Sequence, residues 1–214
     1  MQRFTLECDY VITRKKGVGT MKVDETKERI LDAAIALMSK KGFSSTSVRE
    51  IAAKADVAEM TLFRKFKNKQ ALLEGITERY TKAFSNAKVF AEEWTYDLET
   101  DLCTLSQTYQ RFMEENKAIV LLAYKEAGVH NEVSEGLTAN PKLMKAHLTE
   151  YLQNMQEKGL VTTELDLELQ VMNFMWMNLG HFSSQFISGK KVSQLPTEQF
   201  IESSVKLFVR GLKP

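Results

Sequence analysis

The sequence is poor in the features of secreted and membrane proteins. Its two cysteines, Cys8 and Cys103, stand far apart and form no CxxC pair, which favours reduced thiols in a cytosolic protein. No run reaches the roughly 18 apolar residues that a membrane-spanning helix needs. The first residues also lack the basic, apolar and small-residue order of a signal peptide. We therefore expect a cytoplasmic protein without a membrane partner.

Motifs of enzyme chemistry are missing as well. The histidines His130, His147 and His181 fall in no metal-ligand spacing, and no P-loop, GxGxxG or GxSxG sequence is present. The carboxylates are scattered in the manner of solvated helix faces. We therefore expect no catalytic residues, no metal and no cofactor.

Strand patterns are scarce, and helical periodicity runs through most of the chain. With 43% hydrophobic and 27% charged residues, the 214-residue chain is globular and can bury a sizeable core. Its charge is divided unevenly, since residues 1–75 hold 15 basic and 10 acidic side chains and residues 76–214 hold 14 and 18. A cationic N-terminal part is the electrostatic footprint of DNA binding, although a solvated surface can produce this difference by chance.

The stretch 46–69 predicts two short helices joined by a tight turn. Apolar side chains recur at i, i+3, i+4 and i+7 on the first helix, at Val48, Ile51, Ala52 and Ala55. Ser47 precedes this stripe and Glu50 follows three residues later, which is the pattern of a capping box. Asp56 suits the left-handed conformation of the turn.

The second helix is predicted to begin near Ala58 and to carry an exposed, mixed face. Leu62 and Phe66 lie four residues apart and would point inward. The side chains predicted to point outward are Glu59, Met60, Thr61, Arg64 and Lys65. Two short helices of this kind, joined by a tight turn, describe a helix-turn-helix.

This stretch resembles the DNA-binding domain of the TetR/AcrR family of bacterial regulators, over roughly residues 26–76. The resemblance is carried by Gly42-Phe43, Thr46-Ser47-Val48-Arg49-Glu50-Ile51-Ala52, Thr61-Leu62-Phe63, Phe66, Asn68-Lys69 and Leu72-Leu73. The sequence departs from the family pattern at Asp56, Ala58 and Met60, where members usually have Gly, Ser and a small residue. Ala58 forfeits a helix cap worth about 1 kcal/mol.

The resemblance implies that the second helix enters the major groove of double-stranded DNA. By position it implies base contacts from Met60, Thr61 and Lys65, with Glu59 as a further candidate. The residues implied to contact phosphates are Thr46, Ser47, Arg64 and Lys69. Phe63 also occupies a contact position but lacks the hydroxyl that a tyrosine would offer. A helix-turn-helix retained only as a scaffold is the alternative.

The fold expected is all-α, with a three-helix helix-turn-helix domain over residues 24–75 and an antiparallel helical domain for effector binding and dimerisation over 76–214. Helices are predicted at residues 24–41, 69–91, 99–116, 117–127, 141–158, 166–188 and 197–212, with a loop-like stretch at 131–140. The helix that begins at Lys69 would link the two domains. Residues 1–23 are predicted to be a disordered extension or to include a mis-assigned start, with Arg14-Lys15-Lys16 as a minor-groove arm in the alternative.

The family also implies a pocket in the C-terminal domain for an apolar or amphipathic small molecule. The candidate pocket residues are Phe112, Met113, Tyr124, Met144, Leu148, Tyr151, Met155, Met172, Met175, Trp176 and His181. For each of them an ordinary core position is the alternative, because methionine and aromatic side chains fill any helical bundle. The stretch 166–187 is apolar nearly all round, which favours a homodimer formed through the last two helices.

The function predicted is sequence-specific transcriptional regulation. Paired recognition helices would read a palindromic operator, most often as a repressor, and a small-molecule effector would release the protein from DNA. One alternative is a ligand-independent architectural or adaptor protein on the same fold, with a C-terminal domain packed solid. The other is a helical enzyme, which requires convergent titratable groups in the pocket.

Overall fold

The computed structural model describes residues 24–87, 94–126 and 131–214, so the predictions for residues 1–23 lie outside the described residues. Every regular element in these ranges is a helix, as predicted. The elements are α1 (Glu25–Lys41), α2 (Val48–Lys54), α3 (Glu59–Lys65), α4 (Lys69–Asn86), α5 (Leu98–Glu115), α6 (Lys117–Glu126), α7 (Asn131–Glu157), α8 (Leu167–Phe182), the π-helix η1 (Ser183–Ile187) and α9 (Thr197–Leu212).

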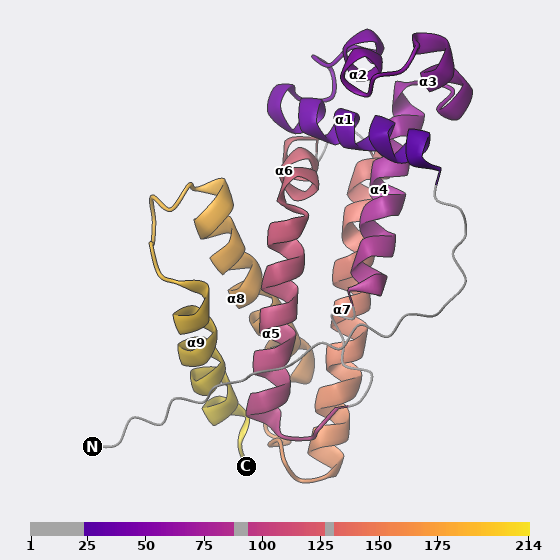
Figure 1. Ribbon diagram of the computed structural model, residues 1–214. Helices are drawn as coiled ribbons and strands as arrows, with labels where there is room; N and C mark the ends of the chain where they lie inside the picture. The colour runs from indigo at the N-terminus through magenta and orange to yellow at the C-terminus, as the bar shows by residue number, and fades with distance from the viewer. Residues whose placement is uncertain (1–23, 88–93, 127–130) are drawn as a thin grey trace.

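Helices α1, α2 and α3 form one end of the molecule, and the helices that follow form a bundle below them (Figure 1). Helix α4 leaves the three-helix end and packs along α7, while α6 reaches up to contact α1. Helices α8 and α9 lie on one side of the bundle, where both pack against α5. Within the described ranges, no helix combines the length and apolar character needed to cross a membrane.

Side-chain caps begin most of these helices. Asp24, Ser47, Asn68, Asp97 and Asp166 each accept a hydrogen bond from a backbone N–H in the first turn of their helix. The capping box predicted for α2 is complete, because the side chain of Glu50 also accepts from the Ser47 backbone. Helix α3 has Ala58 at its N-cap and no side-chain cap, as its sequence predicted.

The predicted loop at residues 131–140 is wrong, because these residues form the first turns of α7 and Pro141 lies inside the helix rather than in its first turn. Proline lacks an N–H, and its presence in a helix interior costs about 3 kcal/mol. Helix α7 packs against both α4 and α8, and its buried residues include Leu148 and Leu152. The free energy gained by burying side chains along this helix therefore exceeds the cost of the interior proline and of the poor helix formers at its start.

The predicted single helix over 166–188 is divided. Helix α8 ends at Phe182 and continues as the π-helix η1, where the Ser188 N–H donates to the Ser183 carbonyl at 2.9 Å. The wider π turn adds a residue to the helix, and this changes the direction in which the side chains that follow it point. Periodicity counted at 3.6 residues per turn does not detect such a change.

Candidate nucleic-acid interface and interhelical cavity

The turn between α2 and α3 has the geometry that the sequence predicted. Asp56 has a φ of 53°, in the left-handed region, and the Val57 N–H donates to the Ala52 carbonyl at 3.0 Å. Leu62 and Phe66 are buried against the core, at 0% and 4% exposure. The inward packing of these two side chains fixes which face of α3 points to solvent.

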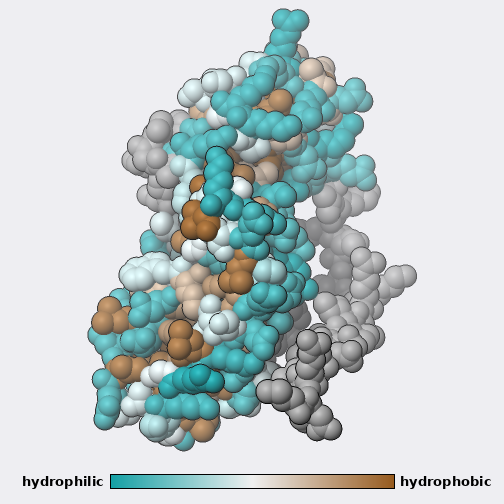
Figure 2. Space-filling model, turned by 90° about the vertical axis from the view of Figure 1, so that its left-hand side faces the viewer, coloured by the Kyte–Doolittle hydropathy of each residue, from teal (hydrophilic) through white to brown (hydrophobic). Residues whose placement is uncertain are grey.

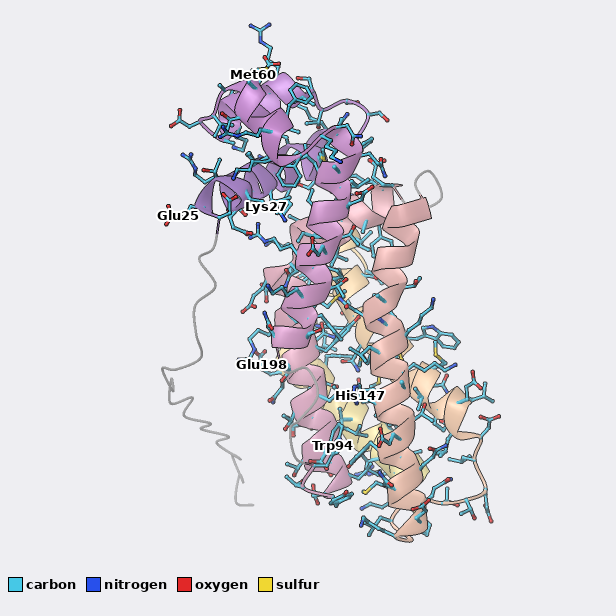
Figure 3. All side chains as sticks on the ribbon, turned by 90° about the vertical axis from the view of Figure 1, so that its right-hand side faces the viewer. Glu25, Lys27, Met60, Trp94, His147 and Glu198 are labelled. Carbon is cyan, nitrogen blue, oxygen red and sulfur yellow. The ribbon has the colours of Figure 1, made fainter. Side chains whose placement is uncertain are left out.

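The outer face of α3 brings the predicted contact residues together at the tip of the molecule. Met60 is 79% exposed and lies at the end farthest from the bundle (Figure 3). Glu59, Phe63, Arg64 and Lys65 are exposed as well, whereas Thr61 is half-buried. A compact, convex surface of this kind can enter a DNA groove.

Two cations on this face differ in their surroundings. The Lys65 ammonium pairs with the Asp24 carboxylate at 2.5 Å, and this pairing lowers the pKa of Asp24. Asp24 also caps α1, so the pair connects α3 to α1. Arg64 forms no ion pair and no hydrogen bond with any residue that the structure describes. Its guanidinium is therefore the more available of the two for a phosphate.

At the start of α2, Ser47 is exposed but engaged. Its hydroxyl accepts from the Glu50 N–H at 3.2 Å and donates to the Glu50 carboxylate at 2.9 Å. Lys41 pairs with the same carboxylate, and together these contacts lower the pKa of Glu50 from 4.5 to about 2. The stabilisation from ionised Glu50 is complete above pH 4.5 and is lost as the pH falls toward 2.

Two residues predicted to contact phosphates, Thr46 and Lys69, interact with other groups of the protein. Thr46 is only 1% exposed, and its hydroxyl donates to the Gly42 carbonyl at 2.9 Å, so this side chain would have to turn outward to contact a phosphate. The Lys69 ammonium lies 4.4 Å from the centre of the Phe43 ring and donates to the Ser44 carbonyl at 3.3 Å. Burial lowers the pKa of Lys69, against the opposing effect of the nearby Glu126 carboxylate.

The end of α6 is joined to the turn after α1, a contact that the sequence did not predict. The Phe43 N–H donates to the Glu126 carboxylate at 2.7 Å, and Glu126 is 7% exposed. Next to it, the Lys125 ammonium donates to the carbonyls of Ser39 and Lys40 at the end of α1. These residues form a junction between the helix-turn-helix end and the bundle, which we call the α1–α6 junction.

Gly42 is required by the backbone at this junction. It has φ 87° and ψ 163°, a conformation essentially restricted to glycine, and an added Cβ would lie 3.4 Å from the Glu126 carboxylate. We expect Gly42→Ala to lower the free energy of unfolding by about 1–3 kcal/mol. Urea unfolding followed by circular dichroism measures this, with Gly211→Ala, whose Cβ meets nothing within 4 Å, as the control. An equal loss in both variants would contradict the prediction.

A cavity of about 310 Å³ lies between α4, α5, α6, α7 and α8. Six predicted pocket residues line it: Met113, Tyr124, Met144, Met172, Met175 and Trp176. The sequence did not single out the other lining residues, which are Tyr80, Phe84, Tyr109, Val120, Ala123, Asn140, Pro141 and Leu179. Tyr80 and Phe84 lie in the helix predicted to link the two domains, and their helical spacing was the only sequence feature that indicated a buried position.

The remaining candidate pocket residues do not line this cavity and are buried in the packed interior. They are Phe112, Leu148, Tyr151, Met155 and His181. The Tyr151 hydroxyl donates to the buried Asp101 carboxylate at 2.8 Å, and burial raises the pKa of Tyr151. The His181 ring stacks on Phe200 with centroids 4.1 Å apart, and burial lowers the pKa of His181.

Helices α8 and α9 expose apolar side chains on the outer side of the bundle, and one of them, Trp176, also lines the cavity. Leu169 and Trp176 on α8 are each 57% exposed, and Leu207 on α9 is 72% exposed. On this face, hydrophobic groups lie in several clusters among hydrophilic ones (Figure 2). The opposite face of α9 packs into the bundle, where Ile201, Val205 and Leu212 are buried.

Known proteins are similar to this chain in sequence. The family profile described as bacterial regulatory proteins, tetR family, matches residues 30–76. The chain is 36% identical to the HTH-type transcriptional regulator YvkB of Bacillus subtilis (strain 168) over 187 residues, which are 87% of this chain and 97% of YvkB. It is 23% identical to the HTH-type transcriptional repressor NicS of Pseudomonas putida over 209 residues, 94% of this chain and 99% of NicS.

Solved structures show the same fold. The fatty acid degradation regulator FadR from Bacillus halodurans superposes with a TM-score of 0.71 at 21% identity, covering 93% of this chain and 98% of FadR. GusR of Salmonella enterica superposes with a TM-score of 0.66 at 23% identity, covering 87% of this chain and 95% of GusR.

Proposed function

Because this chain belongs to the TetR family of bacterial regulatory proteins, it is a helix-turn-helix transcriptional regulator that binds DNA, and we propose that it is a repressor released by a small molecule. The single observation that carries the release is the cavity of about 310 Å³ in the bundle. A ligand-independent adaptor would have no need of such a space, and this favours the effector over the architectural alternative. We place the protein in the cytoplasm, with residues 24–75 as the DNA-binding domain and 76–214 as the effector domain.

The outer face of α3 is our proposed reading surface for DNA. Met60 and Thr61 offer methyl groups to the thymine C5-methyl. Lys65 can contact guanine when its ion pair with Asp24 is broken. Arg64 and the start of α2 at Ser47 are proposed to contact phosphates, which position the protein without specifying sequence.

We propose that the conformational change caused by ligand binding is transmitted by two helices that line the cavity and reach the helix-turn-helix end. Helix α4 brings Tyr80 to the cavity and begins beside the Phe43 ring at Lys69. Helix α6 brings Ala123 to the cavity and ends at the α1–α6 junction with Glu126. A ligand that fits the cavity better in a state with separated recognition helices lowers operator affinity, and DNA lowers ligand affinity by the same factor.

A homodimer through α8 and α9 is proposed to present α3 twice to a palindromic operator. We expect Leu207→Glu to yield monomers, because a charge on each copy would be buried in the shared surface. Sedimentation of the free protein measures whether it is a monomer or a dimer. Selection of bound duplexes from a random pool measures whether palindromic sequences are still preferred. Leu160→Glu, at a leucine 43% exposed beyond α7, is the matched control. A Leu207→Glu protein that stays dimeric and still selects palindromes would contradict this interface.

A further inference from the structure

The cavity has an uncharged lining rich in aromatic rings and thioethers. Its rings belong to Tyr80, Phe84, Tyr109, Tyr124 and Trp176, and its sulphur atoms to Met113, Met144, Met172 and Met175. None of the lining residues is acidic or basic. An anion would give up its hydration here without meeting a positive charge, which is strongly unfavourable, and a cation would meet only the faces of the aromatic rings. The lining therefore selects uncharged molecules with a flat, polarisable surface.

One lining residue carries polar groups that the protein leaves unsatisfied. Asn140 is 3% exposed, and neither its Oδ1 nor its Nδ2 has a hydrogen-bond partner of good geometry among the residues that the structure describes. Burial raises the pKa of the neighbouring Tyr80 to about 12, against an opposing effect of the Asn140 side chain. The Tyr80 hydroxyl makes its own contact with the Met113 sulphur at 3.6 Å. Buried amides are rarely left without partners in folded proteins.

We propose that Asn140 is the polar anchor of the effector site, and that its ligand is an uncharged aromatic molecule bearing a lactam or a similar adjacent N–H and C=O. The side-chain amide offers one acceptor and donors on the same edge, so a lactam can pair with it through two hydrogen bonds. The rest of such a ligand stacks on the rings and thioethers of the lining. This inference rests on the proposed function, because it identifies the ligand of the same cavity.

Four compounds of similar shape test the inference on the full-length protein by equilibrium dialysis. They are 2-quinolone as the lactam, naphthalene as its apolar counterpart, 2-naphthoate as an anion and 2-naphthylmethylammonium as a cation. We expect 2-quinolone to bind the wild-type protein about tenfold more tightly than each of the other three, since two hydrogen bonds together supply this factor. Equal affinity for a charged member would overturn the inference without any variant.

The variant Asn140→Leu removes both polar groups at similar volume. We expect it to weaken 2-quinolone about tenfold and to leave naphthalene unchanged. Met155→Leu, at a buried methionine of α7 that does not line the cavity, is the control and keeps the preference. Thermal unfolding checks that both variants are folded. A 2-quinolone affinity that is the same in wild type and Asn140→Leu would also overturn the inference.

Filling the cavity separates this inference from the proposed function. Ala123→Phe, with Ala123→Leu as a milder substitution, should abolish or weaken binding of 2-quinolone and naphthalene alike. If binding depends on Ala123 but not on Asn140, the polar anchor fails and the effector cavity stands. If none of the four compounds binds, or if filling the cavity changes nothing, both the anchor and the effector cavity are wrong.

Discussion

Arg64→Ala should lower the affinity for every DNA duplex about a hundredfold, because a dimer loses two charge-assisted contacts of about 1.5 kcal/mol each. The guanidinium is exposed on α3 and forms no ion pair or hydrogen bond with the described residues, so its loss leaves no protein group unpaired. The effect therefore reports the DNA contact alone. Since two phosphates lose their partner, the slope of log K against log salt should decrease by about 2.

Fluorescence anisotropy with labelled duplexes at several salt concentrations measures both quantities. Arg111→Ala, which removes the same charge from an exposed position on α5, is the matched control and should leave the slope unchanged. Thr61→Ala should instead change which duplexes are preferred at a constant slope, because a methyl contact to a base carries sequence information. An Arg64→Ala protein with wild-type affinity and slope would show that α3 does not face the DNA backbone.

Local patterns were sufficient to predict the helix-turn-helix from the sequence. The capping box of Ser47 and Glu50, the left-handed turn at Asp56 and the inward packing of Leu62 and Phe66 each depend on residues a few positions apart. Such features are determined by the period of the helix and the chemistry of its caps. The engagement of Thr46 was not predicted: its hydroxyl donates to a carbonyl four residues earlier, as threonine often does.

The cavity could be predicted only in part, because its lining depends on how five helices pack. A buried methionine or tyrosine has the same sequence pattern whether it faces a neighbour or an empty space. Met144 and Tyr151 are seven residues apart on α7, yet Met144 lines the cavity whereas Tyr151 donates a hydrogen bond to Asp101. Asn140 was overlooked because residues 131–140 have the composition of a loop, and tertiary packing makes them helical.

The α1–α6 junction was beyond local prediction, since Phe43 and Glu126 are 83 residues apart in the chain. We expect Glu126→Leu to uncouple the cavity from the DNA-binding end. A ligand that weakens operator binding by wild-type protein, typically about 5–150-fold in coupled systems, should weaken binding by this variant less than about twofold. Ligand binding to the free protein should persist, because Glu126 does not line the cavity.

The choice of replacement distinguishes the hydrogen bond from the charge. Glu126→Gln retains an oxygen that can accept from the Phe43 N–H, so it should preserve most of the response, whereas Glu126→Leu leaves that N–H without its 2.7 Å partner. The unpaired N–H should also lower the free energy of unfolding by about 1–3 kcal/mol. Glu74→Leu, an exposed substitution on α4, controls for loss of a carboxylate. If the leucine variant at position 126 responds to ligand as fully as wild type, transmission runs through α4 alone, which the sequence had suggested as the link.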